Sequence, residues 1–143
     1  MSLDGAYDPD NILARIVRGE IPSARIFEDE RVMAIMDAFP QSRGHALVLH
    51  KTSQARNLLD VEPEALAEVM EAVRKVARAV TATLKPDGVV VTQFNGAPAG
   101  QTIFHLHVHI IPRWEGEGLA SHGRGMADPG ELQALAADIA AHL

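Results

Sequence analysis

Residues 105–109 read His-Leu-His-Val-His, and an apolar pair follows them. Side chains of a β-strand alternate between the two faces of a sheet, so His105, His107 and His109 are expected to share one face. Neighbouring histidines in such a row lie about 7 Å apart. The other face carries only apolar side chains and is suited to a core. The pattern therefore predicts a sheet with one chemically active face.

Three interpretations of this histidine row differ in the chemistry that they assign to it. The row could be the polar face of a surface strand, although three alternating histidines are improbable by chance. It could be a metal site, because three histidines and a water molecule can form a catalytic zinc shell. It could be a set of catalytic histidines without a metal, because imidazole exchanges protons near neutral pH. We favour the third interpretation because of the residues upstream.

The segment before the histidine row has the composition of a ligand-binding loop. Residues 89–94 begin as an apolar, β-branched strand, and an Asn-Gly pair then turns the chain. Gly100 allows a ligand to approach the backbone, and Gln101 and Thr102 add an amide and a hydroxyl. Taken alone, the Asn-Gly pair is better explained as an ordinary hairpin turn. Small residues, backbone N–H groups and neutral donors next to imidazoles together suit a phosphate group.

These segments together resemble the histidine-triad (HIT) family, whose pattern alternates three histidines with apolar residues and ends with two apolar residues. Residues 105–111 match that pattern at every position. Residues 19–29 resemble the family's N-terminal hairpin, and residues 36–37 and 44–49 resemble its nucleoside-contacting segment. The resemblance covers residues 10–114 and is strongest to the bacterial Hint-like branch, the histidine-triad nucleotide-binding proteins.

The resemblance implies an α+β, HIT-like fold, in which a five-stranded antiparallel sheet carries one long helix and short terminal helices. We expect a single HIT domain over residues 1–143, with its core at 10–114 and a variable C-terminal tail with a short helix at 115–143. Proteins of this branch form homodimers in which two sheets join edge to edge, so a homodimer is expected.

The periodicity of the chain predicts where these elements lie. A helix is expected at residues 10–18, a long helix at 60–84 and a last short helix after Pro129, ending near Leu143. Strands are expected in an antiparallel meander at 24–27, 32–37, 45–50, 89–94 and 102–111. The long helix is expected to bury Leu66, Val69, Met70, Val73, Val76, Ala77, Val80 and Leu84.

Four histidines receive catalytic roles from their positions in the family pattern. His107 matches the nucleophile, which attacks the α-phosphorus of a nucleotide and forms a nucleotidyl-histidine intermediate. His109 is expected to contact the phosphate and protonate the leaving group, and His105 to orient the nucleophile's strand. His45 is expected to fix an imidazole tautomer. Crowding favours a neutral His107, whereas the substrate phosphate favours a protonated His109.

The resemblance also implies a nucleotide pocket. Asn95 and Thr102, with backbone N–H groups near Gly100 and Gln101, are expected to stabilise the phosphate oxygens. Asp37 matches a residue that accepts hydrogen bonds from the ribose hydroxyls. The purine is expected in an apolar slot formed by Ile12, Leu13, Ile16 and Ile35.

Other residues are expected outside this pocket. Three histidines, His50, His122 and His142, are predicted to be surface residues. Trp114 and the glycine-rich stretch 115–125 directly follow the histidine strand. We expect them to influence which leaving groups are accepted.

Many relatives carry a Cys-x-x-Cys pair and a later histidine that bind structural zinc. This chain has no cysteine, and Asn11, Ala14 and Ser53 stand at the matching positions. None of these side chains replaces a thiolate or imidazole ligand well. We therefore predict no metal and no cofactor, and expect apolar packing around Ile12 and Leu13 to hold this corner.

Composition narrows the possible partners. The net charge of −6 argues against a nucleic-acid polymer as the main ligand, although a mononucleotide needs only a local patch. The sequence has no apolar run of about 18 residues that could span a membrane. It has no signal-peptide pattern, and a cytoplasmic protein is expected.

Three functions are consistent with these observations. The first is a purine nucleoside phosphoramidate hydrolase that releases AMP or GMP. The second is a dinucleoside polyphosphate hydrolase of the Fhit type, which uses the same histidines on a different leaving group. The third, from another class, is a nucleotide-binding module with incidental turnover. A nucleotidyltransferase is disfavoured because that branch has glutamine where this chain has His109.

Overall fold

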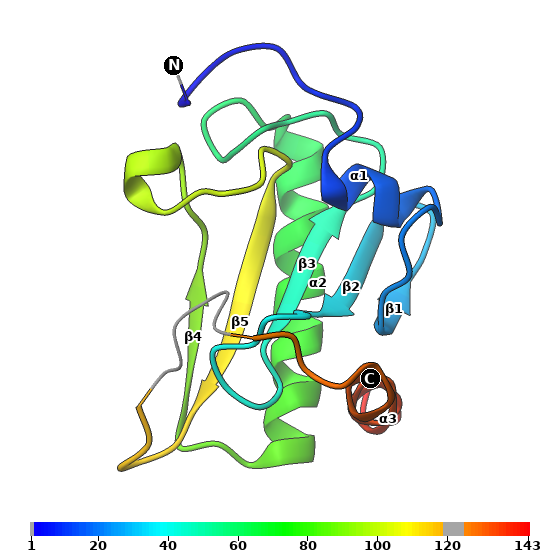
Figure 1. Cartoon of the computed structure of the whole chain (residues 1–143), viewed down its shortest axis with the longest axis vertical. Helices are drawn as coiled ribbons and strands as arrows, with labels where there is room; N and C mark the ends of the chain where they lie inside the picture. Colours follow the sequence, from blue (N-terminus) through cyan, green and yellow to red (C-terminus); the bar gives the residue numbers. More distant parts are fainter. Residues whose placement is uncertain (1, 119–124) are drawn as a thin grey trace.

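The computed structural model of the protein describes residues 2–118 and 125–143, and it confirms the α+β class. A five-stranded antiparallel sheet carries one long helix and short helices (Figure 1). In chain order the elements are α1 (Ile12–Val17), β1 (Arg25–Glu28), β2 (Val32–Met36), β3 (Ala46–His50), α2 (Pro63–Leu84), β4 (Gly88–Thr92), the 3₁₀ turn η1 (Ala97–Ala99), β5 (His107–Arg113) and α3 (Pro129–Ala140).

The strand order is β1-β2-β3-β5-β4, so the predicted simple meander is wrong. After β3 the chain crosses one sheet face as α2 and returns as the edge strand β4. Strand β5 then inserts between β3 and β4, with His109 opposite Leu47 on one side and Thr92 on the other. The histidine strand is therefore held by hydrogen bonds along both of its edges.

The first helix is shorter than predicted because its N-cap is Asn11. The Asn11 side chain accepts a hydrogen bond from the Ala14 backbone N–H, so the helix begins at Ile12 instead of residue 10. After the helix, Gly19 adopts a φ of +80°, a left-handed conformation that ends helices and favours glycine.

Two apolar clusters cover opposite faces of the sheet, and α2 and α3 pack on one face while α1 packs on the other (Figure 1). The larger cluster joins α2 and α3 to Val108 and Ile110 of β5. Most of the predicted apolar residues of α2 lie in or against this cluster, but Met70 is exposed. Several of the buried residues of α2 are alanines, whose small side chains let the helix lie close to the sheet.

Within the described ranges, no helix is both long enough and apolar enough to cross a membrane. The long helix α2 has 22 residues, but its sequence includes several charged side chains.

Two residues near the C-terminus allow a test of this packing. Ile139 of α3 is fully buried, whereas Leu143, which was predicted to belong to the same apolar face, is 41% exposed. Ile139→Ala is expected to lower the free energy of unfolding by about 2–5 kcal/mol because it leaves a cavity. Leu143→Ala is expected to change it by less than about 0.5 kcal/mol. Urea denaturation checks both values, and equal losses in the two variants would contradict the packing of α3.

Candidate active site

Two of the three histidines lie side by side in β5, and the third precedes the strand. His107 is half-buried, His109 is buried, and their ring centroids are 5.0 Å apart. Strand β5 begins at His107, so the prediction of a strand from residue 102 is wrong for residues 102–106. The intervening Val108 contributes to the core below the sheet, as the alternation predicts.

Residues 101–106 form no strand because their polar groups bind neighbouring loops. The Gln101 side-chain amide donates to the carbonyls of Arg56 and Ile103, and its oxygen accepts from the Gly96 N–H. The Leu106 N–H donates to the Ala55 carbonyl. These bonds replace the strand ladder and fix the loop that leads into the histidines.

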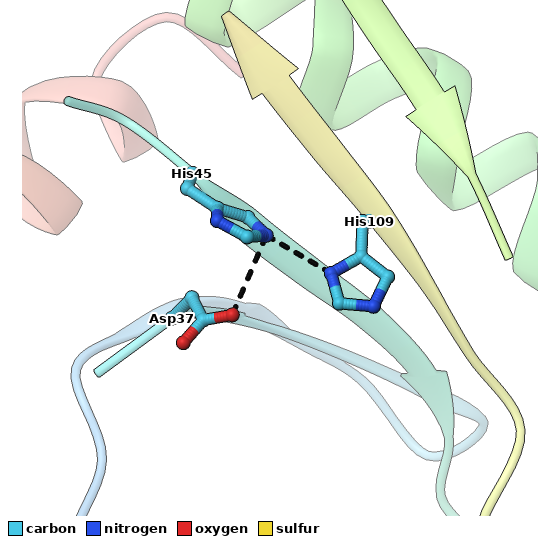
Figure 2. A group of neighbouring side chains, drawn as sticks. All are labelled: Asp37, His45 and His109. Atoms are coloured by element: carbon cyan, nitrogen blue, oxygen red, sulfur yellow. Dashed lines mark hydrogen bonds and ion pairs between the residues drawn. The ribbon is translucent and has the colours of Figure 1, made fainter. Parts of the chain in front are cut away.

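His45, the residue before β3, contacts His109 at the end of the histidine row. Its Nε2 lies 2.9 Å from His109 Nδ1 and 3.4 Å from Asp37 Oδ2, and all three residues are buried (Figure 2). The preceding Gly44 has a φ of +92°, and a Cβ there would overlap Leu84. Glycine at this position therefore allows the loop after β2 to deliver His45 to the site.

The hydrogen bonds of His45 determine its tautomer. Its Nδ1 accepts from the Gln41 backbone N–H at 3.0 Å, and a backbone N–H can only donate. The ring proton of His45 therefore lies on Nε2, close to the Asp37 carboxylate, and is donated to His109 Nδ1. His109 must then carry its own proton on Nε2, the ring nitrogen that points away from His45 (Figure 2).

This arrangement also bears on the protonation of His109, and a protonated His109 opposite a substrate phosphate stays a prediction. A charged imidazolium needs a proton on both nitrogens, but Nδ1 of His109 accepts the proton of His45. The described state of His109 is therefore neutral, with its proton on Nε2. The sequence predicted the role of His45 in fixing a tautomer, and the hydrogen bonds now identify His109 as the imidazole that it fixes.

The hydrogen bond of His107 determines which of its ring nitrogens carries the proton. His107 Nδ1 lies 2.7 Å from the His105 carbonyl oxygen, which can only accept, so Nδ1 carries the proton. The lone pair of a neutral His107 is then on Nε2. An imidazole with this tautomer is a nitrogen nucleophile at neutral pH.

His105 is held on both sides of its ring. Its Nε2 donates to the His50 carbonyl at 2.9 Å, and the Tyr7 hydroxyl lies 2.7 Å from its Nδ1. Burial is the main cause of the low pKa of His105, which is about 4; the hydrogen bond to the His50 carbonyl opposes this effect, and electrostatic repulsion from His107 and His50 adds to it. His105 is therefore neutral, and Nδ1 accepts the hydrogen bond from Tyr7.

A small pocket opens at the histidine row and brings together much of the predicted site. Its volume is about 140 Å³. It is lined by the predicted residues Gly100, Gln101, Thr102, His107 and His109 and by two residues that the sequence analysis missed, Gln41 and Phe94. The Phe94 ring lies 5.4 Å from the His109 ring. Gln41 lies 68 positions before His109, so only the fold brings them together.

Three of the groups predicted to contact the phosphate form hydrogen bonds within the protein. The Gly100 and Gln101 backbone N–H groups donate to the Ala97 and Gly96 carbonyls within the loop. The Asn95 side-chain oxygen accepts from the Leu58 N–H and from Gln93. These groups therefore shape the loop from within, and Thr102, whose side chain is exposed at the pocket, is the predicted neutral donor that lines it.

The predicted nucleoside contacts divide into two groups. Leu13, Ile16 and Ile35 belong to one buried cluster on the α1 side of the sheet, whereas Ile12 is 52% exposed and lies outside that cluster. Asp37 is buried, and its Oδ1 accepts from the Phe39 N–H. Its proximity to His45 was not predicted, and its role in ribose binding stays a prediction.

The prediction for His50 is wrong, because this residue is buried instead of lying on the surface. Its Nδ1 accepts from the Ser53 N–H at 3.0 Å, and its Nε2 faces Glu68 at 3.3 Å. A buried imidazole with partners at both nitrogens is stable inside a protein. His142 is exposed, as predicted, and His122 lies outside the described residues.

A larger cavity of about 430 Å³ lies near the C-terminal end of β5 and includes Trp114 and Arg113. Its lining contains none of the site histidines, so we assign the chemistry to the smaller pocket. The effect of Trp114 on leaving groups stays a prediction, and part of the glycine-rich stretch lies outside the described residues.

The residues at the corner where many relatives are expected to bind zinc do not suit this metal. Asn11 caps α1, the Ser53 hydroxyl donates to Glu62, and Ala14 has no donor atom. The cluster of Asp37, His45 and His109 has donor atoms within 4.8 Å of one another. However, a metal on His45 Nε2 would require a proton on Nδ1, where the Gln41 N–H already donates. Neither group of residues fits a bound metal in this arrangement.

Comparisons with known proteins agree with the sheet and the histidine row. A family model described as the HIT domain matches residues 18–116. The chain is 38% identical over 136 residues to Protein hit of Bacillus subtilis, covering 92% of this chain and 93% of that protein. The chain therefore belongs to the HIT family.

Two further relatives of this chain are a solved structure and an enzyme. The solved structure of a HIT-like protein from Bartonella henselae, described as involved in cell-cycle regulation, matches with a TM-score of 0.89 and 46% identity, over 96% of this chain and 100% of that chain. Adenylylsulfatase HINT3 of Arabidopsis thaliana is 34% identical over 119 residues, covering 79% of this chain and 60% of that protein. The family thus includes hydrolases that act on nucleotides.

The low pKa of His105 makes stability depend on pH. Below pH 6.5 the unfolded chain binds a proton at this residue that the folded protein excludes. The free energy of unfolding is therefore expected to fall by about 3 kcal/mol, from this residue alone, as the pH drops from 6.5 to 4. Urea denaturation across this range should give a flatter pH dependence for His105→Gln than for the wild type. The exposed His142→Gln is the control, and a wild-type pH dependence in His105→Gln would refute the assignment.

Proposed function

We propose that the protein is a purine nucleoside phosphoramidate hydrolase that releases a nucleoside monophosphate through a nucleotidyl intermediate on His107. The observation that carries this proposal is the 2.7 Å hydrogen bond from His107 Nδ1 to the His105 carbonyl. It assigns the lone pair to Nε2 in an imidazole that lines the pocket. Membership of a family that includes an adenylylsulfatase supports a nucleotide as the substrate.

The first step transfers the nucleotidyl group to His107. The Nε2 lone pair attacks the α-phosphorus, a P–N bond forms, and the bond to the leaving nitrogen breaks. The electron pair departs with the amine, which takes up a proton from solvent. The positive charge that develops on the His107 ring is stabilised by the hydrogen bond from Nδ1 to the His105 carbonyl.

His109 and Thr102 support this step as hydrogen-bond donors. Because His45 holds the proton of His109 on Nε2, His109 donates to a phosphate oxygen or to the leaving atom without losing its proton. Thr102 lines the same pocket and offers its hydroxyl to the phosphate. In the second step water attacks the phosphorus, the bond to His107 breaks, and a proton is released to solvent.

The nucleoside is proposed to lie between the α1 side of the sheet and the histidines. Leu13, Ile16 and Ile35 form a buried apolar cluster behind this position, and the exposed Ile12 offers apolar surface that is selective for shape more than for the identity of the base. Asp37 is proposed to accept hydrogen bonds from the ribose, since a carboxylate has lone pairs beyond the one that the Phe39 N–H occupies.

Two alternatives have the same histidines and differ in testable ways. A dinucleoside polyphosphate hydrolase would form the same intermediate with a nucleotide as leaving group. A binding module would hold AMP without forming the intermediate. Cleavage of adenylyl sulfate is a further possibility that the Arabidopsis thaliana relative suggests.

A fluorogenic adenosine phosphoramidate tests the proposal. Chelator-treated wild type is expected to cleave it faster than diadenosine polyphosphate or adenylyl sulfate. His107→Ala should lower kcat by at least about a thousandfold, because it removes the nucleophile. Rapid quenching followed by mass spectrometry should find one nucleotidyl group on wild-type His107.

His142→Ala, which changes an exposed histidine, is the matched control and should retain activity. Full activity in His107→Ala, or activity that a chelator abolishes, would contradict the proposed mechanism. Tight AMP binding without turnover of any of the three substrates would favour the binding module.

We also propose that the protein is a homodimer joined through β4. Strand β4 is at one edge of the sheet, and Val90 and Val91 are 36% and 45% exposed there. The opposite edge, β1, carries an ion pair between Arg25 and Glu28, and charges on an edge strand discourage pairing.

Light scattering tests the dimer. The wild type is expected at twice 15.4 kDa, and Val91→Lys is expected at 15.4 kDa because it introduces two charges into a symmetric interface. Leu143→Lys, which replaces an exposed apolar residue away from β4, should remain a dimer. A monomeric wild type at micromolar concentration, or a dimeric Val91→Lys, would contradict an interface at β4.

A further inference from the structure

The carbonyl that orients the nucleophile lies where the sheet no longer holds the chain. His107 is the first residue of β5, opposite Leu49 of β3. His105, whose carbonyl accepts the His107 hydrogen bond, lies two residues earlier, outside the ladder. Its position must therefore be fixed by other contacts.

Those contacts are made largely by the His105 ring. One ring nitrogen donates to the His50 carbonyl at the end of β3, and the other accepts from the Tyr7 hydroxyl. The ring is 2% exposed, so water does not readily replace either partner. The Leu106 N–H adds one backbone bond to Ala55. Without Tyr7, Nδ1 would be a buried acceptor that has lost its donor.

The chain around Tyr7 is hydrogen-bonded to the loop before α2. The Arg56 guanidinium donates to the Ala6 carbonyl at 3.1 Å and lies 4.8 Å from the centre of the Phe104 ring, next to His105. Asn57 donates to the Leu3 carbonyl. The N-terminal segment is thus anchored on the loop before α2, whose Arg56 also contacts the residue that precedes His105, and this arrangement brings the Tyr7 hydroxyl to Nδ1.

From this geometry we propose that Tyr7 is a positioning residue for the nucleophile. The His50 carbonyl fixes the Nε2–H tautomer of His105, and the Tyr7 hydroxyl, by donating to Nδ1, holds that ring in one orientation. The His105 carbonyl then holds the His107 ring with its lone pair on Nε2. The inference rests on the proposed function for its effect on turnover. Its effect on the two histidine rings is independent of the substrate.

Tyr7→Phe tests the inference because it removes only the hydroxyl. Ring-nitrogen NMR of histidine-labelled protein should show a single Nε2–H tautomer for His105 in the wild type. In Tyr7→Phe the ring resonances of both His105 and His107 should shift. With the phosphoramidate substrate, kcat should fall by about tenfold to a hundredfold, while KM changes by less than about threefold, because orientation is lost and binding is not.

Thr83→Val is the matched control, because the Thr83 hydroxyl also lies 2.9 Å from a histidine Nδ1, that of the exposed His142. It should leave kcat and the resonances of His105 and His107 unchanged. Tyr7 is the only tyrosine of the chain, so growth on 3-fluorotyrosine modifies this residue alone. That protein keeps a hydroxyl donor and should retain wild-type kcat, with a shift confined to the His105 ring.

The outcomes separate this inference from the proposed function. Unchanged His107 resonances in Tyr7→Phe would refute the inference, as would an equal loss of kcat in Thr83→Val. If the wild type cleaves no phosphoramidate, the proposed function fails, yet the histidine resonances still decide the role of Tyr7. If Tyr7→Phe does not fold, the 3-fluorotyrosine protein decides it, and an unchanged His105 ring there would overturn the inference.

Discussion

A buried neutral imidazole needs one partner that accepts and one partner that donates, and this requirement organises the site. His45, His50 and His105 are each buried with a partner at both ring nitrogens. In His45 and His105 a main-chain group, which can act in only one sense, determines which nitrogen carries the proton. The backbone thus fixes the tautomer of His45, which in turn fixes that of His109, and the His105 carbonyl fixes that of His107. The chemistry of the site is therefore a consequence of where the backbone places its N–H and C=O groups.

The geometry separates the tasks of the three triad histidines. In the proposed reaction, His107 presents a nucleophilic nitrogen, His109 presents a proton that His45 holds in place, and His105 supplies a carbonyl instead of its ring. Because each task depends on a different neighbour, a substitution at His45 should disturb the proton of His109, and one at Tyr7 should disturb the orientation of the His107 ring. A site of this kind needs little rearrangement when a substrate arrives, which is the condition under which electrostatic stabilisation is most effective.

The sequence predicted the fold class and the shared face of His107 and His109, because both depend on local periodicity. The alternation of side chains predicted that His107 and His109 lie on one face of the strand and Val108 on the other. The helical repeat predicted most of the apolar residues of α2 that pack in or against the core, but it wrongly included Met70. It failed where contacts join distant segments. Tyr7 and His105 are 98 positions apart, and no local pattern connects them. His50 looked like a surface residue because Glu68, the partner of its Nε2, becomes a neighbour only when α2 folds back over β3.

Strand β5 has a consequence for how such proteins diverge. Its alternate side chains line the pocket and the core, so natural selection for the proposed activity and for stability acts on interleaved positions of the same short run. Few substitutions in that run satisfy both pressures, and the strand is expected to change slowly among descendants. New substrate preferences are more accessible through Gln41 and the neighbouring loop residues, which reach the pocket without contributing to either cluster of the core. Lineages of this fold can therefore inherit one reaction and still come to use different substrates.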